Sequence, residues 1–347
     1  MNRIAIREVS LLYMGIEGIK KRYANITAIG GYLPDHRRTN ADLEKITETS
    51  DEWIVQRTGI RERRILEDGL GTSDMIVKAV EDMLRHYPKD IQSVDALLVA
   101  TSTPDMMMPS TANILAEKLQ LEQVTAFDVN AACSGFLHVL DIGAAFIESG
   151  RHKNVLVIGA DKISSYVDIN DRSTNILFGD GAGVVWLEPS EEEGIIDSLL
   201  LGNGKGTAFL NIEGGGSLFP FTEELLHSNK RHIKQNGKVV FKEAIRSMSE
   251  ACRDILKKHA FKIKDVDWLV PHQANQRIID AVGNELKIDP MKTLVNIAYY
   301  GNTIAATIPL CIWEHRDKLK KGDLMMLTAF GAGFSWGASL LRWSLST

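Results

Sequence analysis

A cysteine at position 133 stands where a predicted strand ends and a predicted helix begins. Residues 124–129 are apolar and β-branched apart from Asp128, and they predict a buried strand. Residues 133–149 predict a helix, with Gly150 where a left-handed C-terminal cap belongs. The unpaired amides and the dipole of a helix N-terminus favour an anion, so we expect a lowered thiol pKa and a nucleophilic Cys133. The alternative is a structural cysteine, because free cysteine is among the most buried residue types.

Two further polar side chains, His272 and Asn302, follow predicted strands at 268–270 and 295–297. Active-site residues collect at strand ends in α/β folds. A thiol, an imidazole and an amide placed together suit acyl transfer, because the thiolate takes the acyl group and the N–H donors bind a thioester oxygen as it becomes an enolate. Taken singly, His272 could be a half-buried structural histidine and Asn302 a turn or capping residue beside Gly301.

Two glycine-rich stretches, residues 178–183 and 330–337, could each approach a ligand with backbone amides. Neither fits the phosphate-binding pattern Gly-x-x-x-x-Gly-Lys-Ser/Thr or a dinucleotide-binding fingerprint. The second follows a predicted strand at 324–328, so we expect its amides to face the nucleophile as an oxyanion hole. The first is expected to be a tight turn between strands with close backbone packing.

The elements that must position these residues occur twice. The apolar strand that begins at Val94 resembles the one that begins at Val266, and the strand from Val155 resembles that from Leu324. The members of each pair are separated by nearly the same length of chain, and an amphipathic helix precedes the first strand of each half. Matched segments in the same order favour a duplicated α/β unit over chance likeness between short apolar strands.

Cys133 and Asn302 are as far apart in the sequence as Val155 and Leu324, so we expect them at equivalent helix starts that face each other. Alternating helices and apolar strands imply sheets covered on both faces. The helix after Cys133 is apolar nearly all round, which predicts a central helix between two sheets, with Gly135 and Gly143 allowing close packing. We divide the chain into an extension at 1–22 and two halves at 23–190 and 191–347.

The bulk composition narrows the class of protein. The 347 residues carry a formal net charge of −5, which argues against nucleic acid as the main partner. Three widely separated cysteines fit free thiols in a reducing cytosol, and no cluster of metal ligands is apparent. No apolar run approaches the roughly 18 residues that a membrane span needs. We therefore expect a cytoplasmic protein without membrane segments, nucleic-acid partners or a bound metal.

The chain resembles a known family, the β-ketoacyl-acyl-carrier-protein synthases III, over about residues 26–343. These enzymes initiate bacterial fatty acid synthesis and have a duplicated, thiolase-like α/β fold in five layers, αβαβα. The resemblance rests on these motifs, in this order: Thr49-Ser50-Asp51-Glu52-Trp53-Ile54, Arg57-Thr58-Gly59-Ile60-Arg61, Ala131-Ala132-Cys133-Ser134-Gly135-Phe136, Gly179-Asp180-Gly181-Ala182-Gly183, Pro271-His272-Gln273-Ala274-Asn275, Tyr300-Gly301-Asn302-Thr303, and residues 331–337.

The resemblance implies a role for each matched residue. Cys133 would be the acylated nucleophile, and His272 and Asn302 would promote decarboxylation of malonyl and stabilise the carbanion. The backbone amides of Cys133 and Ala332 would form the oxyanion hole. Relatives usually have glycine at position 332, and alanine is tolerable there if its φ is negative. Ile304 stands where relatives commonly have a small polar residue.

The resemblance also implies contacts with coenzyme A. Trp53 and Arg172 would sandwich the adenine, by stacking and cation–π contact. Arg57 would contact a phosphate and Asn275 the pantetheine. Met108 would reach across a homodimer and limit the primer chain; many relatives have phenylalanine there, and the flexible methionine leaves primer length open.

The implied reaction is a decarboxylating Claisen condensation of an acyl-CoA, acetyl-CoA in first place, with malonyl-acyl carrier protein. The resemblance implies no metal or redox cofactor, and coenzyme A enters as the thioester substrate. Acyl carrier proteins are acidic, so docking needs a local basic surface. Residues 230–264 contain 11 Lys and Arg and three Asp and Glu. At roughly 100° per residue, one helix face gathers Lys242, Arg246, Arg253 and Lys257, and Arg277 matches a carrier-protein contact; a merely solvated face is the alternative.

Other functions remain open on the sequence alone. A related condensing enzyme of secondary metabolism would use another primer or acceptor. A thioester hydrolase with Cys, His and Asn would admit water to the acyl-enzyme. A thiolase proper would need a second catalytic cysteine near the C-terminal glycine loop, which neither Cys252 nor Cys311 provides.

Overall fold

Two mixed β-sheets form the framework of the chain, whose computed structural model describes residues 22–346. The predicted extension at 1–22 therefore lies outside the described residues, apart from Arg22. The first sheet has the order β1-β7-β6-β4-β5, with β4, β5 and β6 parallel and β1 and β7 antiparallel. Its strands are β1 (Tyr23–Tyr32), β4 (Ala96–Ala100), β5 (Thr125–Val129), β6 (Val155–Asp161) and β7 (Gly181–Ser190).

The second sheet repeats this plan with four strands in the order β11-β12-β13-β8, where β11 and β12 are parallel. All its strands come from the second half of the chain. They are β8 (Ile195–Gly202), β11 (Trp268–Pro271), β12 (Leu324–Gly331) and β13 (Ser335–Arg342). Two short ribbons complete the sheets, made by β2 (Arg37–Thr39) with β3 (Glu62–Arg64) and by β9 (Leu210–Asn211) with β10 (Lys234–Gln235).

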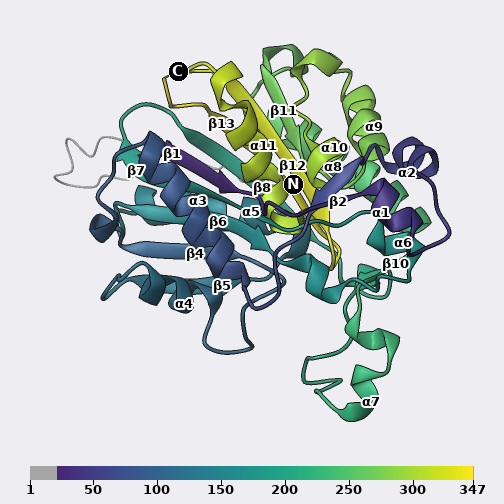
Figure 1. Cartoon of the computed structure of the whole chain (residues 1–347). Coiled ribbons are helices and arrows are strands. Elements are labelled where there is room, and N and C mark those ends of the chain that lie inside the picture. Colours follow the sequence, from purple (N-terminus) through teal and green to yellow (C-terminus); the bar gives the residue numbers. More distant parts are fainter. Residues whose placement is uncertain (1–21, 347) are drawn as a thin grey trace, which may run out of the picture.

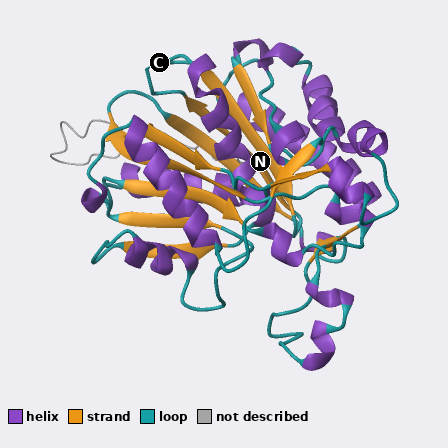
Figure 2. Cartoon of the chain, viewed as in Figure 1, coloured by secondary structure: helices purple, strands orange, loops and turns teal. Residues whose placement is uncertain are grey.

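Helices lie on both faces of each sheet and give five layers, as Figures 1 and 2 show. Helices α3 (Thr72–His86) and α4 (Thr111–Lys118) cover the outer face of the first sheet. Helices α5 (Gly135–Glu148) and α11 (Thr307–His315) contact both sheets and form the middle layer. Helix α8 (Gly237–Lys258) covers the second sheet, and α9 (Gln276–Leu286) packs on α8 and shares the same hydrophobic core. This is the αβαβα arrangement that we expected.

The predicted central helix is confirmed as α5. Its apolar residues join strands of both sheets in one core that includes Leu137, Val157 and Leu327. A Cβ atom at Gly143 would lie 2.7 Å from a methyl carbon of Val157, so glycine lets the helix pack closely on the first sheet. Gly150, with φ of +72°, occupies the left-handed position after the helix, also as predicted.

Two strand predictions are wrong in detail. The predicted buried strand before Cys133 is β5, which forms the edge of the first sheet and is half-buried along its length. The segment 295–297 is not a strand; only a single bridge between Leu269 and Thr293 remains, and the chain turns into the short helix α10 (Ile297–Tyr300). An apolar run does not distinguish an edge strand from a central one, because the difference depends on distant neighbours.

The equivalence between Cys133 and Asn302 also needs correction. A 3-10 turn (Ala132–Ser134) leads into α5, and a matching 3-10 turn (Ile304–Ala306) leads into α11. Both turns begin with a residue at positive φ, +47° at Ala132 and +53° at Ile304. These two residues are as far apart in the sequence as the first residues of β4 and β11. The counterpart of Cys133 is therefore Ala305, and Asn302 comes before the second turn.

The remaining helices lie around one end of the sheets. They are α1 (Asn40–Glu44), α2 (Asp51–Thr58), α6 (Arg172–Asn175) and α7 (Glu223–Leu226). Helix α7 belongs to an arm, residues 213–232, that projects from the body in Figure 1. The Ile233 amide, at the base of this arm, donates a hydrogen bond of 2.8 Å to the Tyr166 carbonyl oxygen. Within residues 22–346, no helix combines the length and apolar character needed to cross a membrane.

Candidate active site

One cavity of about 450 Å³ brings together the predicted nucleophile, imidazole and amide. It lies between the two halves of the chain, where β11, the β12–β13 turn and the two 3-10 turns meet. The projecting arm supplies part of its wall through residues 214–216 and Phe221. The predicted site residues that line this cavity are Cys133, His272, Asn275, Asn302 and Ala332.

Cys133 sits in the turn before α5, with its neighbour Ala132 at positive φ. A Cβ atom at Gly331 would lie 2.7 Å from the Cys133 amide nitrogen, so only glycine lets the end of β12 come this close. The next residue, Ala332, lines the same cavity and does not have a positive φ. The amides of Cys133 and Ala332 thus belong to adjoining backbone segments, as an oxyanion hole requires.

The expected lowering of the thiol pKa is wrong for the resting site. Burial raises the pKa of Cys133 to about 12, and the nearby Asp161 carboxylate adds to this effect. Cys133 lies in an apolar cluster with Ile163, Phe178 and Ile304, where a thiolate would lose its hydration. The Cys133 side chain is therefore a neutral thiol near pH 7, and the helix start alone does not ionise it.

His272 follows β11 and is 2% exposed. Its Nδ1 lies 2.7 Å from the Thr307 hydroxyl oxygen. Among the described residues nothing else forms a hydrogen bond with the ring, so Nε2 is left without a protein partner. Burial lowers the pKa of His272 to about 3, which keeps the imidazole neutral. His272 is therefore not the half-buried structural histidine that we considered, because its ring is buried and one ring nitrogen at the cavity has no protein partner among the described residues.

Asn302 is held by its backbone and by one atom of its amide. Its N–H donates to the Leu177 carbonyl at 2.8 Å, and its carbonyl accepts from Gly179 N–H at 3.1 Å. Its Oδ1 accepts a hydrogen bond of 2.9 Å from the Ile304 amide. Because Oδ1 is occupied, Nδ2 is the atom available to a ligand. Asn302 thus does hold the following turn, as we considered from the sequence. The same hydrogen bond leaves the N–H groups of its side chain as donors.

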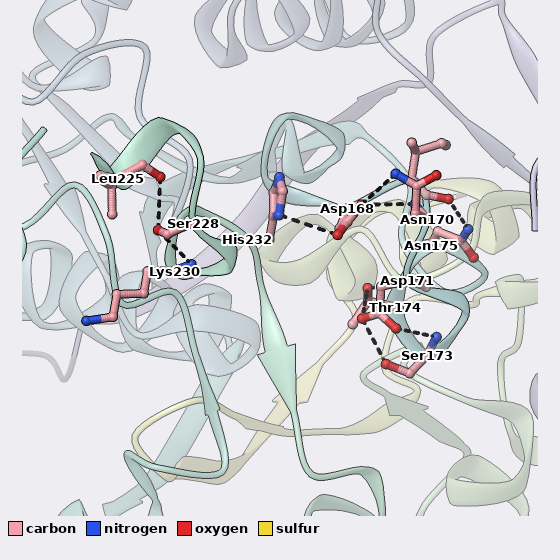
Figure 3. A network of polar contacts seen from close by, with 11 residues as sticks. Asp168, Asn170, Asp171, Ser173, Thr174, Asn175, Leu225, Ser228, Lys230 and His232 are labelled. Atoms are coloured by element: carbon pink, nitrogen blue, oxygen red, sulfur yellow. Dashed lines mark hydrogen bonds and ion pairs between the residues drawn. The ribbon is translucent and has the colours of Figure 1, made fainter. Parts of the chain in front are cut away.

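The two residues expected to hold adenine lie against each other. The Arg172 guanidinium carbon is 4.7 Å from the centre of the Trp53 ring, and that of Arg57 is 5.5 Å from it. Figure 3 shows how the Arg172 segment is braced, since the Asp171 carboxylate accepts hydrogen bonds from Ser173 and Thr174. A distance of 4.7 Å between the guanidinium carbon and the ring centre leaves no room for an inserted ring, so a base between Trp53 and Arg172 requires Arg172 to move away.

This Trp53 cluster is connected to the cavity through hydrogen bonds. Asn275 Nδ2 donates to the Arg57 carbonyl oxygen at 3.0 Å, and Asn275 Oδ1 accepts from the Arg277 amide at 2.9 Å at the start of α9. Gln235, another cavity residue, donates to the Ser173 carbonyl at 3.2 Å. The side chain of Asn275 is thus already bonded as a helix cap, which competes with the predicted pantetheine contact.

Met108 is not part of the cavity wall of its own chain. It is 82% exposed on the loop that follows β4, whereas its neighbour Met107 lines the cavity. The predicted role of Met108 in a primer pocket thus needs a second chain to bring it there. That role stays a prediction.

The predicted basic face of α8 is exposed but partly neutralised. Arg246 lies 2.6 Å from Glu243 and 3.5 Å from Glu250, and Arg253 lies 3.0 Å from Glu285. Arg277 has no carboxylate within ion-pair distance among the described residues, and its guanidinium carbon lies 5.4 Å from the Phe241 ring centre, beside the cavity. Arg277 is therefore available to an acidic partner, as are the exposed Lys242 and Lys257.

Sequence reasoning missed two polar residues, one near Cys133 and one in contact with His272. Asp161, at the end of β6, is fully buried and accepts hydrogen bonds from the Ala305 and Ser102 amides at 3.0 and 2.7 Å. It thereby joins the two halves of the chain, and burial raises its pKa to about 7. The second residue is Thr307, the partner of His272. An aspartate at the end of an apolar strand was a usable signal for the first, but nothing in the local sequence indicates the second.

The chain matches one enzyme family over nearly its whole length. Residues 127–204 match a sequence model described as 3-oxoacyl-[acyl-carrier-protein (ACP)] synthase III, and residues 256–343 match the model of its C-terminal part. The chain is 49% identical over 322 residues to β-ketoacyl-[acyl-carrier-protein] synthase III 1 of Bacteroides thetaiotaomicron, covering 92% of this chain and 96% of the relative. It is 45% identical over 328 residues to the synthase III of Porphyromonas gingivalis, covering 94% and 98%.

Solved structures show the same likeness. The crystal structure of 3-oxoacyl-[acyl-carrier-protein] synthase III from Aquifex aeolicus superposes with a TM-score of 0.85 at 44% identity, over 92% of this chain and all (100%) of that one. The synthase III from Thermus thermophilus gives a TM-score of 0.86 at 39% identity, over 92% and 99%.

Proposed function

Because this chain belongs to the 3-oxoacyl-[acyl-carrier-protein] synthase III family, we propose that it condenses an acyl-CoA with malonyl-acyl carrier protein to give a 3-oxoacyl-acyl carrier protein, the step that initiates fatty acid synthesis. The observation that carries this proposal is one cavity in which a thiol, a neutral imidazole and an amide donor meet. We infer that acetyl-CoA is the primer, as is usual in the family.

The first half-reaction loads the nucleophile. The Cys133 sulfur attacks the acyl carbonyl carbon, and the oxyanion that forms accepts hydrogen bonds from the amides of Cys133 and Ala332. The carbon–sulfur bond to coenzyme A then breaks, and the thiol proton of Cys133 ends on the departing sulfur. A buried, neutral thiol suits this exchange, because no charged sulfur has to be kept in an apolar cluster between turnovers.

The second half-reaction uses the donors of the other half of the chain. Malonyl loses carbon dioxide, and the electrons of the broken bond pass to an enolate on the thioester. His272 Nε2 and Asn302 Nδ2 stabilise its oxygen. The enolate carbon attacks the acyl-cysteine, the carbon–sulfur bond breaks, and the thiolate takes a proton from solvent. A neutral imidazole donates a hydrogen bond without quenching the carbanion, which an imidazolium would protonate.

The substrates are proposed to enter beside α2, α6 and α9. Trp53 and Arg172 would take the adenine of coenzyme A, Arg57 a phosphate, and Asn275 the pantetheine. Arg277, beside the basic face of α8, would contact the acidic carrier protein. Support comes from the hydrogen bond between Asn275 and the Arg57 backbone, which connects these residues to the cavity.

We further propose a homodimer. Strand β5 is a sheet edge with half-buried residues, and the loop between β4 and α4 exposes Met106, Met107 and Met108. Pairing of two β5 edges would cover both features and could bring Met108 to the partner's cavity. The three cysteines are unpaired, which fits the reducing cytoplasm that we propose as the location.

Intact-mass measurement tests the proposed function. Acyl-CoA alone should give a stable adduct on Cys133, and malonyl-acyl carrier protein should remove it with release of carbon dioxide. An adduct that disappears in buffer alone would indicate a hydrolase. No adduct with any acyl-CoA would overturn the proposal.

Carrier-protein docking has its own test. Replacing Arg277 and Arg246 by glutamate should raise the KM for malonyl-acyl carrier protein without changing acyl loading. The matched control is Lys78→Glu, because Lys78 is exposed on α3 in the opposite outer layer. Equal damage to both half-reactions would count against docking at this surface.

A further inference from the structure

Thr307 is the first residue of α11 and is 2% exposed. Its hydroxyl oxygen lies 2.7 Å from His272 Nδ1 and 3.0 Å from the Ile304 carbonyl oxygen. A hydroxyl has one proton, so it can donate to one of these acceptors at a time. The choice decides which nitrogen of the His272 ring carries its proton.

Two arrangements satisfy the distances. If Thr307 donates to the Ile304 carbonyl, it must accept from Nδ1–H, and Nε2 then faces the cavity as an acceptor. If Thr307 donates to Nδ1, the ring proton stays on Nε2, which then faces the cavity as a donor. The ring is neutral, so only one nitrogen carries a proton in either case.

We propose that Thr307 is a positioning residue for the condensation step: its hydroxyl donates to His272 Nδ1 and so keeps the ring proton on Nε2, aimed at the thioester oxygen. This rests on the proposed function, in which the enolate oxygen needs a donor and not an acceptor. The Ile304 carbonyl oxygen already accepts a hydrogen bond from the Thr307 backbone N–H, so it does not depend on the hydroxyl proton. Among the described residues, Thr307 is the only hydrogen-bond partner of the ring.

The same turn orients the second donor. The Ile304 amide occupies Asn302 Oδ1 at 2.9 Å and leaves Nδ2 for the substrate. Ile304 has φ of +53°, a region that β-branched residues rarely occupy, and the Asn302 side chain braces it there through the Ile304 amide. One turn of backbone therefore sets the direction of both donors, Nδ2 of Asn302 directly and Nε2 of His272 through Thr307.

Two variants of the full-length enzyme test this proposal. Thr307→Val keeps the shape of the side chain and removes the hydroxyl, whereas Thr307→Ser keeps the hydroxyl. We expect Thr307→Val to lower kcat for condensation by about 10- to 100-fold, the usual effect of removing a partner that orients a reactive group. Acyl loading of Cys133 should stay within about threefold of wild type, and Thr307→Ser should restore most of the condensation rate.

A structural role alone would give a different pattern. If Thr307→Val lowers loading and condensation alike, or if Thr307→Ser is as slow as Thr307→Val, the positioning role is wrong. Thermal melting of each variant separates a folding defect from a catalytic one.

Nitrogen-15 NMR of the wild-type protein, labelled in its histidine rings and assigned with His272→Ala, keeps the proposal testable if a variant fails to fold. We expect a protonated Nε2 and an unprotonated Nδ1. A protonated Nδ1 would overturn the proposal even if the wild-type enzyme condenses normally. Failure of the proposed function would appear separately, as a wild-type enzyme that does not condense at all.

Discussion

The turn before α5 and the turn before α11 follow the same backbone path but present different chemistry to the cavity. Each begins with a residue at positive φ, Ala132 in one and Ile304 in the other. The first turn presents Cys133. In the second, the equivalent position holds Ala305. Asn302 lies before this turn and accepts a hydrogen bond from the Ile304 amide, and Thr307 lies after it and contacts His272.

This difference suggests how a duplicated unit came to run two half-reactions. In the first half, β5 forms a full strand beside β4, and the chain then enters the nucleophile turn directly. In the second half, the corresponding strand is reduced to one bridge at Thr293. Residues 294–303 are therefore not held in this sheet. Within them, Asn302 bonds the Leu177 carbonyl and forms a β-bridge with Phe178 in the first half. The proposed mechanism therefore places covalent chemistry and carbanion stabilisation in different halves, so single substitutions should separate them.

Removing the nucleophile should have the largest effect. In Cys133→Ala nothing can hold the acyl group, so condensation should fall by on the order of 10⁴-fold or more. Intact mass after incubation with acyl-CoA should show no adduct. An adduct of normal yield on the variant would mean that the first turn does not carry the covalent step.

Removing a donor of the second half should affect one half-reaction only. His272→Ala and Asn302→Ala each take away a hydrogen bond to the enolate, and we expect condensation to fall about 10²- to 10³-fold. Loading of Cys133 should change by no more than a few fold. The two rates are measured separately, by adduct formation and by product formation. Equal losses in both rates would show that His272 and Asn302 do not act in condensation alone.

A residue outside both turns should affect only substrate affinity. Trp53→Ala removes the stacking surface for the base, so the KM for acyl-CoA should rise about tenfold, in keeping with ~1–3 kcal/mol for stacking on an aromatic ring. The kcat with malonyl-acyl carrier protein should stay unchanged after loading is complete. A lowered kcat at saturating acyl-CoA would show that Trp53 also shapes the cavity.

Asp161, which bonds the Ala305 amide of the second turn, should make stability depend on pH. Its pKa is about 7 in the folded chain against 3.8 as the ordinary value, because burial penalises the charged form. Between these values unfolding releases a proton, so the free energy of unfolding should decrease as pH rises, by at most about 1.4 kcal/mol per pH unit. Below pH 3.8 and above pH 7, Asp161 should not make the free energy of unfolding depend on pH.

The matched variant is Asp161→Asn, which cannot ionise. Denaturant unfolding at several pH values should show that the difference in stability between wild type and variant shifts in favour of the variant from pH 4 to 7. A constant difference over this range would mean that Asp161 is already ionised at low pH.

Much of the fold was predictable because the strong patterns are local. The apolar strand β6 and the amphipathic helices α3 and α8 occur where their periodicity placed them, with small shifts at the ends. The edge position of β5 was not predictable, because an apolar run gives no information about its neighbours. The site residues Cys133, His272 and Asn302 were found from their motifs, and the structure places all three at one cavity.

What the sequence could not give depends on contacts between distant residues. The thiol pKa of Cys133 was predicted from the helix start, yet burial by other segments raises it. Thr307 carries no motif of its own, since its role comes from a histidine far away in the sequence. The spacing of the repeated strands made Asn302 the apparent counterpart of Cys133, and only the matching turns show that Ala305 holds that place.

Carbon dioxide release by Cys133→Ala tests the division between the two halves most directly. If the second turn drives decarboxylation, this variant should still release carbon dioxide from malonyl-acyl carrier protein, although it forms no acyl adduct. Adding His272→Ala to the same variant should abolish the release. If Cys133→Ala releases no carbon dioxide, or if the double variant releases as much as the single one, the assignment of the two half-reactions to the two turns is wrong.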